Sequence, residues 1–117
     1  MSRGAARIAV SGGWRGAAAA LLLAAAPGLA LAQATVEVKM EDYKFIPAEV
    51  KIKRGTTVKW TNTERRTSHS VVFIVEKFES DRLFPGESYQ RKFDKPGTYA
   101  YTCGPHPEMK AVIIVTE

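Results

Sequence analysis

The sequence predicts an all-β domain, an antiparallel sandwich or a barrel, with about seven to eight short strands. Apolar and polar residues alternate with a period of two in several short runs, of which residues 36–41 and 58–61 are typical. Turn signals such as Arg54-Gly55 and Pro96-Gly97 separate these runs. No stretch of convincing length has the periodicity of a helix. Short strands at this spacing are typical of sandwiches and barrels.

The expected strands follow one another along the chain. Six runs have an apolar strand pattern, at residues 36–41, 50–53, 58–61, 88–93, 98–103 and 111–115. Residues 71–75, Val-Val-Phe-Ile-Val, are rich in β-branched side chains, which predicts a strand buried on both of its faces. Residues 76–82 are mostly charged and are expected to form an exposed connection.

The first 32 residues are interpreted as a secretory signal peptide. Three arginines precede the apolar run at 17–26, Pro27-Gly28 ends it, and Ala30-Leu31-Ala32 offers the small residues of a cleavage site. We expect cleavage after Ala32, with Ala34 as the alternative. An uncleaved membrane anchor is disfavoured because the run is short for a bilayer and is interrupted.

The exported domain is then expected to cover residues 33–117, with no later stretch able to span a membrane. The formal net charge of the chain is +5, but Arg3, Arg7 and Arg15 all belong to the predicted signal. Without them, 14 basic and 12 acidic residues remain, a net charge of +2. So small a surplus argues against nucleic acid as a partner.

Cys103 is the only cysteine, so an intramolecular disulfide is impossible. Small exported domains often depend on disulfides or on a metal because their hydrophobic core is limited. A lone thiol in an oxidising compartment also needs protection. Both considerations indicate a metal.

The candidate metal ligands are concentrated in one segment. Cys103, His106 and Met109 have the spacing C-x2-H-x2-M between two expected strands, where a tight loop can turn all three side chains toward one point. His69, the other histidine, begins the apolar run 69–75 and can supply a fourth ligand. Two imidazoles, a thiolate and a weak axial thioether are the ligands of type-1 copper. Zinc rarely uses methionine, and the haem motif C-x-x-C-H is absent.

Other interpretations of these residues are weaker. A single cysteine, histidine or methionine is most often a core or hydrogen-bonded residue. On that interpretation, however, the only cysteine, both histidines and a methionine would share the spacing of a ligand set by accident. For Met40, core packing is favoured over metal ligation, since this residue continues the face of Val36 and Val38. A Cys–His nucleophile pair is disfavoured because the two residues lie three apart on one short loop. No spare histidine is left to act as the base of such a pair.

Several stretches carry a family resemblance, namely residues 45–50, 55–62, 84–88 and 96–109, together with His69 opening a strand. With them, residues 35–116 resemble the cupredoxins, most closely the amicyanin branch and its neighbour plastocyanin. The resemblance implies a Greek-key β-sandwich and one copper that cycles between Cu(I) and Cu(II). It assigns the ligands as His69, Cys103, His106 and Met109.

The resemblance also implies one-electron transfer in the periplasm by a monomer that is not an enzyme. Its partners would be redox proteins, such as a c-type cytochrome or a periplasmic dehydrogenase. His69 should be buried, and His106 should lie near the surface as the exit for the electron. Arg65 and Arg66 precede His69 and either favour an acidic partner by steering or form a solvated loop.

Three positions near the ligands modify this expectation. Ser70 stands where the family usually has asparagine; its N–H can still donate to the thiolate, but its side chain is shorter. Pro105 has no N–H to donate to the Cys103 sulfur, which should lower the reduction potential. Glu108 stands where amicyanin carries an aromatic residue.

Two classes of function follow from these observations. The first is a diffusible one-electron carrier with type-1 copper. The alternative is a periplasmic copper-binding protein for delivery, storage or resistance. The sequence has no Met-rich or His-rich tract, which favours the carrier. A copper oxidase is disfavoured because no residues remain to build a second copper centre.

Overall fold

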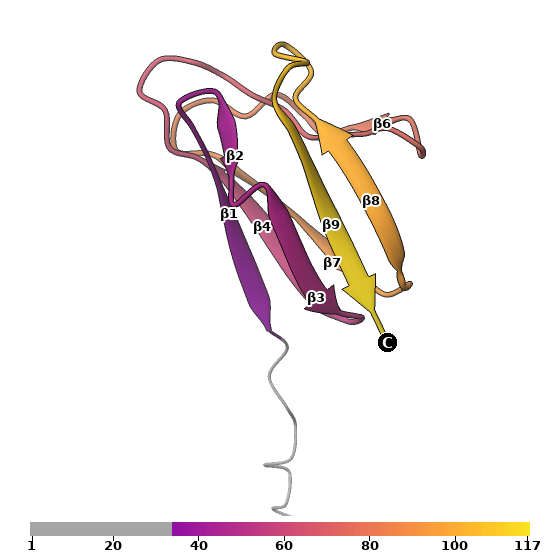
Figure 1. Cartoon of the computed structure of the whole chain (residues 1–117). Helices are drawn as coiled ribbons and strands as arrows, with labels where there is room; N and C mark the ends of the chain where they lie inside the picture. Colours follow the sequence, from indigo (N-terminus) through magenta and orange to yellow (C-terminus); the bar gives the residue numbers. More distant parts are fainter. Residues whose placement is uncertain (1–33) are drawn as a thin grey trace, which may run out of the picture. The chain divides into compact units, whose positions relative to one another are not determined.

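Two β-sheets pack face to face in the computed structural model, which describes residues 34–117 (Figure 1). The first sheet has the order β2-β1-β4-β7, with bounds Lys44–Ile46, Thr35–Glu41, Thr56–Asn62 and Ser88–Phe93. The second has the order β3-β9-β8-β5-β6, with bounds Glu49–Lys53, Lys110–Thr116, Gly97–Thr102, Val72–Phe73 and Phe78–Glu79. The all-β prediction is confirmed. The predicted signal peptide, residues 1–32, lies outside the described residues.

Each sheet contains one parallel pair, which the expected antiparallel sandwich did not include. Strand β1 runs parallel to β4, and β3 runs parallel to β9. The cause is β3, which carries the chain back along the opposite sheet, so that β4 starts at the same end as β1. Gly55 makes the turn between β3 and β4 with a φ of +90°, a conformation that glycine adopts without steric cost. Within residues 34–117, no helix is long and apolar enough to cross a membrane.

The core lies between the sheets and is centred on Trp60. Alternate residues of β1 and β4 point inward, so Val38, Met40, Val58 and Trp60 are fully buried. This confirms the core assignment of Met40. The Trp60 ring lies 5.5 to 6.4 Å from the ring centroids of four aromatic residues, Tyr101, Tyr89, Phe73 and Phe93. These rings come from both sheets and therefore fix the distance between them.

The predicted buried strand at 71–75 is wrong in its second half. Val71 and Phe73 are buried, but Ile74 is half exposed and Val75 is 84% exposed. The chain turns over residues 74–77, with Lys77 at a φ of 55°, and returns as β6 at the edge of the sheet. Ile74 and Val75 are exposed because they belong to this turn and not to a strand.

The connection predicted at 76–82 is also more structured than expected. Residues 78–79 form β6, and Ser80 is buried, where its hydroxyl accepts the Val71 N–H at 3.0 Å. Strands β2 and β6 raise the total to nine among residues 34–117, against the seven to eight expected. Each is too short to leave an alternating pattern in the sequence.

An ion pair fastens the β5–β6 hairpin to the other sheet. Arg91, on β7, donates to both carboxylate oxygens of Glu76 at 2.7 and 2.8 Å. Its guanidinium also lies 4.5 Å from the Phe73 ring centroid and 4.6 Å from that of Phe93. Because the pair is bidentate and stacked on aromatic rings, it is better ordered than a typical surface ion pair.

We expect Glu76→Gln to lower the free energy of unfolding at pH 7 by no more than about 1 kcal/mol, since the Glu76 side chain is partly exposed. The hydrogen bond from Arg91 lowers the pKa of Glu76 in the folded protein. The stabilisation is therefore complete above the unfolded pKa and is lost as the pH falls through the lowered one. Urea unfolding at pH 7 and in acid checks this. A difference between variant and wild type that persisted in acid would contradict it.

Candidate metal centre

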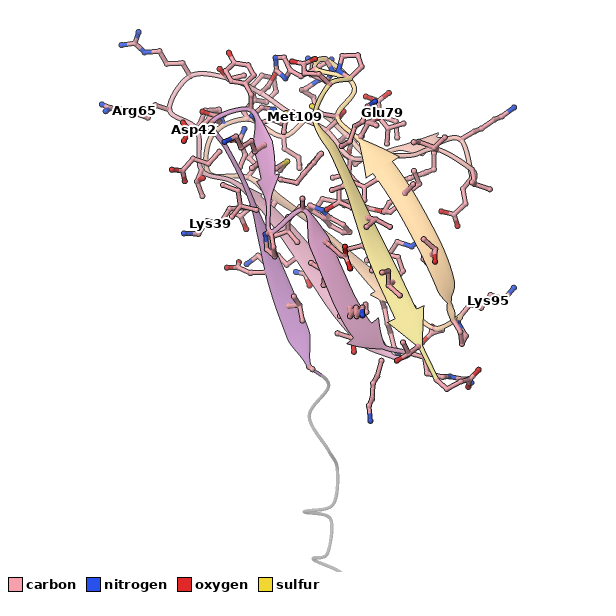
Figure 2. The ribbon with its side chains drawn as sticks, viewed as in Figure 1. Lys39, Asp42, Arg65, Glu79, Lys95 and Met109 are labelled. Atoms are coloured by element: carbon pink, nitrogen blue, oxygen red, sulfur yellow. The ribbon has the colours of Figure 1, made fainter. Side chains whose placement is uncertain are left out.

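The predicted ligands meet at one end of the sandwich. His69 lies on the loop between β4 and β5, and the loop between β8 and β9 carries Cys103, His106 and Met109. Figure 2 shows Met109 at this end, together with Asp42 and Arg65, while Lys95 lies at the opposite end. Two loops that are remote in sequence therefore build the site.

Three donor atoms face one another across a small gap. The Cys103 Sγ lies 3.6 Å from His69 Nδ1 and 3.7 Å from His106 Nδ1, and the two nitrogens are 3.2 Å apart. A circle through three atoms at these separations has a radius of about 2.0 Å. Nitrogen and sulfur bind first-row divalent ions at roughly 2.0–2.3 Å. The geometry and chemistry of His69, Cys103 and His106 thus fit a single metal ion.

Met109 lies at the end of the same loop and is 2% exposed. Its backbone N–H donates to the His106 carbonyl at 2.9 Å, which closes the loop into a tight turn after the second histidine. The predicted fourth donor is therefore buried, on the loop that also carries Cys103 and His106.

His69 is held from both sides. Its backbone exchanges two hydrogen bonds with Leu83, at 3.0 and 2.7 Å. Its Nε2 lies 3.1 Å from a carboxylate oxygen of Glu64, so the ring can donate there while Nδ1 turns its lone pair to the site. The ring is fully buried, and burial lowers the pKa of His69 although Glu64 opposes this. A neutral imidazole in this tautomer is the form that binds a metal.

The sequence reasoning missed Glu64, which orients His69. Burial acts to raise the pKa of Glu64, but hydrogen bonds from the Tyr43 N–H and from His69 lower it overall. The Tyr43 N–H donates at 3.0 Å. Buried Asn62 fixes this loop, since its amide donates to the Thr67 and Leu83 carbonyls at 2.8 and 2.9 Å. A carboxylate five residues before the histidine was the only available signal.

Cys103 is buried, and burial raises the pKa of its thiol, while the backbone N–H groups of Ser70 and His106 oppose the rise. The Ser70 N–H lies 3.4 Å from the sulfur, as the sequence led us to expect. A thiol with a raised pKa is a poor nucleophile, which argues further against a hydrolase. A metal ion would deprotonate it outright.

Ser70 also reaches the ligand loop with its side chain. Its hydroxyl oxygen accepts the Gly104 N–H at 3.0 Å. The shorter side chain therefore still ties the loop of Cys103 to the segment of His69. Pro105, next in the loop, has no N–H and makes no such contact.

His106 is only partly buried, which confirms that it lies near the surface. Tyr43 covers it from outside. Its ring meets His106 edge-on, with centroids 4.7 Å apart, and lies 5.9 Å from the His69 ring. No sequence pattern predicts this contact, because it depends on the positive φ of 58° that turns Tyr43 toward the site. Tyr43 is nearly half exposed, so it forms part of the surface over the site.

A sequence model of the family described as "Cupredoxin-like domain" matches residues 15–115. Amicyanin-alpha from Methylorubrum extorquens is 42% identical over 86 residues, which cover 69% of this chain and 71% of the relative. Plastocyanin from Scenedesmus fuscus is 42% identical over 84 residues, covering 61% of this chain and 85% of the relative. The resemblance to cupredoxins is confirmed.

Solved structures have the same fold. Amicyanin from Paracoccus versutus superposes with a TM-score of 0.64 at 33% identity, covering 74% of this chain and 86% of that one. A Cu-containing nitrite reductase from Thermus scotoductus superposes with a TM-score of 0.69 at 35% identity. That match covers 74% of this chain but only 23% of the enzyme's chain.

We expect Glu64→Ala to weaken copper binding by about 10- to 100-fold, the usual loss when a partner that orients a metal-binding histidine is removed. The matched control is Glu41→Ala, because Glu41 accepts a hydrogen bond at 2.8 Å from Thr63 of the same loop without contacting a histidine. Competition with a chelator of known affinity measures both. Equal losses in the two variants would argue against the orienting role.

Proposed function

The chain belongs to the cupredoxin-like family, and on that premise we propose that it carries single electrons between redox partners at a type-1 copper site. The observation that carries this proposal is the triangle of His69, Cys103 and His106 donor atoms around one point. Copper, when bound, supplies the one-electron couple between Cu(I) and Cu(II). The chain supplies a frame that keeps the donors in place.

We propose Met109 as the fourth, axial ligand. It is buried, lies three residues after His106 and is joined to it by the backbone hydrogen bond of the turn. A thioether is a weak axial donor in type-1 copper sites, where the axial ligand tunes the reduction potential. A donor set fixed by two rigid loops changes little between oxidation states, which keeps the reorganisation energy of electron transfer small.

The electron would enter and leave through His106. Of the three donor residues that face one another, only His106 is partly exposed, while His69 and Cys103 are buried. The surface formed by Tyr43 and His106 is therefore where a redox protein would dock. A c-type cytochrome or a dehydrogenase suits this role. Arg65, at the same end, would favour an acidic partner (Figure 2).

We further propose that the protein is exported to the periplasm as a monomer after cleavage behind Ala32 or Ala34. The support is the sequence pattern of residues 1–32, with its arginines, apolar run and small residues. Export would also place the lone buried thiol of Cys103 in an oxidising compartment, where a bound metal protects it.

A role in copper delivery, storage or resistance is the alternative. Such a protein must release its ion readily, whereas two donor residues here are fully enclosed and held by hydrogen bonds. The buried, braced geometry favours the carrier. The activity of the nitrite reductase is not part of the proposal, because this chain matches a small part of that enzyme.

We expect the Cu(II)-loaded protein to absorb strongly in the visible region through charge transfer from the Cys103 thiolate. Cys103→Ala should abolish this band. The visible absorption spectra of wild type and variant provide the test. A colourless Cu(II) complex of the wild type, or an unchanged band in the variant, would end the type-1 proposal.

Met109→Leu should keep copper bound but raise the reduction potential, because loss of a weak axial donor disfavours the oxidised ion. Met40→Leu is the matched control, since Met40 is a buried methionine of β1 that packs in the core. Its potential should stay at the wild-type value. Voltammetry of both variants checks this, and a lowered potential for Met109→Leu would contradict the axial role.

A further inference from the structure

We propose that Glu79 is a positioning residue for the metal site, which it reaches through the hydroxyl of Ser70. The inference rests on the proposed function, since it assigns a residue outside the ligand set to the control of the same copper centre. Glu79 lies on β6, 24 positions before Cys103, in a segment where a charged residue would ordinarily be only a solvated side chain.

Three hydrogen bonds connect Glu79 to the ligand loop. The Ser70 hydroxyl donates to a Glu79 carboxylate oxygen at 2.7 Å and accepts the Gly104 N–H at 3.0 Å. The backbone N–H of Ser70 donates to the Cys103 sulfur at 3.4 Å. Ser70 therefore holds both Cys103 and the residue after it.

The carboxylate decides how the Ser70 hydroxyl is used. A serine hydroxyl has one proton, and here that proton is committed to Glu79, which turns an oxygen lone pair toward the Gly104 N–H. A hydrogen bond to a charged acceptor is stronger than a neutral one and polarises the hydroxyl oxygen. Without Glu79 the hydroxyl could rotate, and the bond that restrains Gly104 would weaken.

Gly104 shows how closely Glu79 approaches the ligand loop. A Cβ at position 104 would collide with the Glu79 carboxylate and would lie 2.6 Å from the Ser70 oxygen. The absence of a side chain at Gly104 therefore makes room for this contact. The negative charge of Glu79 consequently lies beside the residue that follows the cysteine ligand. Figure 2 shows Glu79 at the same end of the sandwich as Met109.

The β5–β6 hairpin fixes Glu79 from both sides. Glu79 is paired with Val72 and its neighbour Phe78 with Phe73. The next residue, Ser80, exchanges two hydrogen bonds with Val71, at 2.9 and 3.0 Å. The backbone of Glu79 is therefore fixed, and the hydrogen bond from the Ser70 hydroxyl holds the carboxylate of this exposed residue.

Glu79 should influence the site in two separable ways. Its hydrogen bond restrains the loop of Cys103 and Gly104. Its charge favours the oxidised site, which carries one more positive charge than the reduced site, and so lowers the reduction potential. Glu79→Ala removes both contributions, whereas Glu79→Gln keeps an oxygen acceptor for Ser70 and removes only the charge.

The decisive experiment compares these two variants with Glu76→Gln, which removes the same charge from the same hairpin without touching the ligand loop. In the copper-free protein, hydrogen exchange at the Gly104 amide is measured by NMR. In the copper-loaded protein, Cu(II) affinity and reduction potential are measured. Urea unfolding separates local effects from a loss of global stability.

For Glu79→Ala we expect Gly104 exchange to accelerate about tenfold or more, and Cu(II) affinity to fall about 10- to 100-fold. Glu79→Gln should keep the exchange rate near the wild-type value and raise the potential. Glu76→Gln should leave Gly104 exchange unchanged and shift the potential less. Combining Ser70→Ala with Glu79→Ala should lower the Cu(II) affinity no more than the more harmful single change does, because both changes break one hydrogen-bond network.

Unchanged Gly104 exchange in Glu79→Ala, or an equal effect in Glu76→Gln, would overturn the inference. Failure of the role of Glu79 can be distinguished from failure of the proposed carrier function. If the wild type forms no coloured copper complex, the carrier proposal fails, but exchange in the copper-free protein still decides whether Glu79 restrains the loop. If the wild type is coloured and exchange is unaffected, only the role of Glu79 fails.

Discussion

The approach of the His69 segment to the Cys103 loop is the contact on which the whole site depends. The two residues are 34 positions apart, and the strand that follows His69, β5, pairs with β8 at only two positions. So short a ladder cannot define the place of a side chain by itself. Hydrogen bonds around it supply the missing restraint, because Asn62 holds the preceding loop, Leu83 holds the backbone of His69, and Ser70 bonds to the sulfur.

The electrostatic state of the site follows from the same contacts. Burial lowers the pKa of His69 and raises that of Cys103, while a carboxylate oxygen of Glu64 lies 3.1 Å from the outer nitrogen of the histidine. The contact with Glu64 aims a lone pair of His69 at the site, and a metal ion that binds there would deprotonate the Cys103 thiol. Folding therefore positions most of the donors before the ion binds.

The sequence predicted the parts of this structure that short-range patterns encode. Alternation in β1 and β4 placed Val38 and Trp60 in the core, and the spacing of the only cysteine with a histidine and a methionine identified the ligand loop. The end of β5 was misjudged because Ile74 and Val75 look like core residues, but they lie in the turn that leads to the edge strand β6 and are therefore exposed. Apolar character predicts burial only where a second layer is present.

The contacts of Glu64, Tyr43 and Glu79 could not be predicted, for a related reason. Tyr43 and Glu79 act across segments that are far apart in the sequence, whereas Glu64 precedes His69 by five residues on one irregular loop, whose course does not follow from the spacing. None of the three belongs to a motif. Tyr43 reaches the histidines through a left-handed backbone conformation, and Glu79 through the space left by a glycine on another strand connection. Such contacts depend on the three-dimensional course of the backbone, which residue spacing does not encode.

The place of β9 in the second sheet has a consequence for how the molecule assembles. It is the last of the nine described strands to leave the ribosome, yet it lies between β3 and β8 and pairs with both. Until it emerges, those two strands have no common neighbour, and the loop of Cys103 lacks its second stem. This sheet can therefore close only after β9 is in place, and before then the chain has no complete metal site.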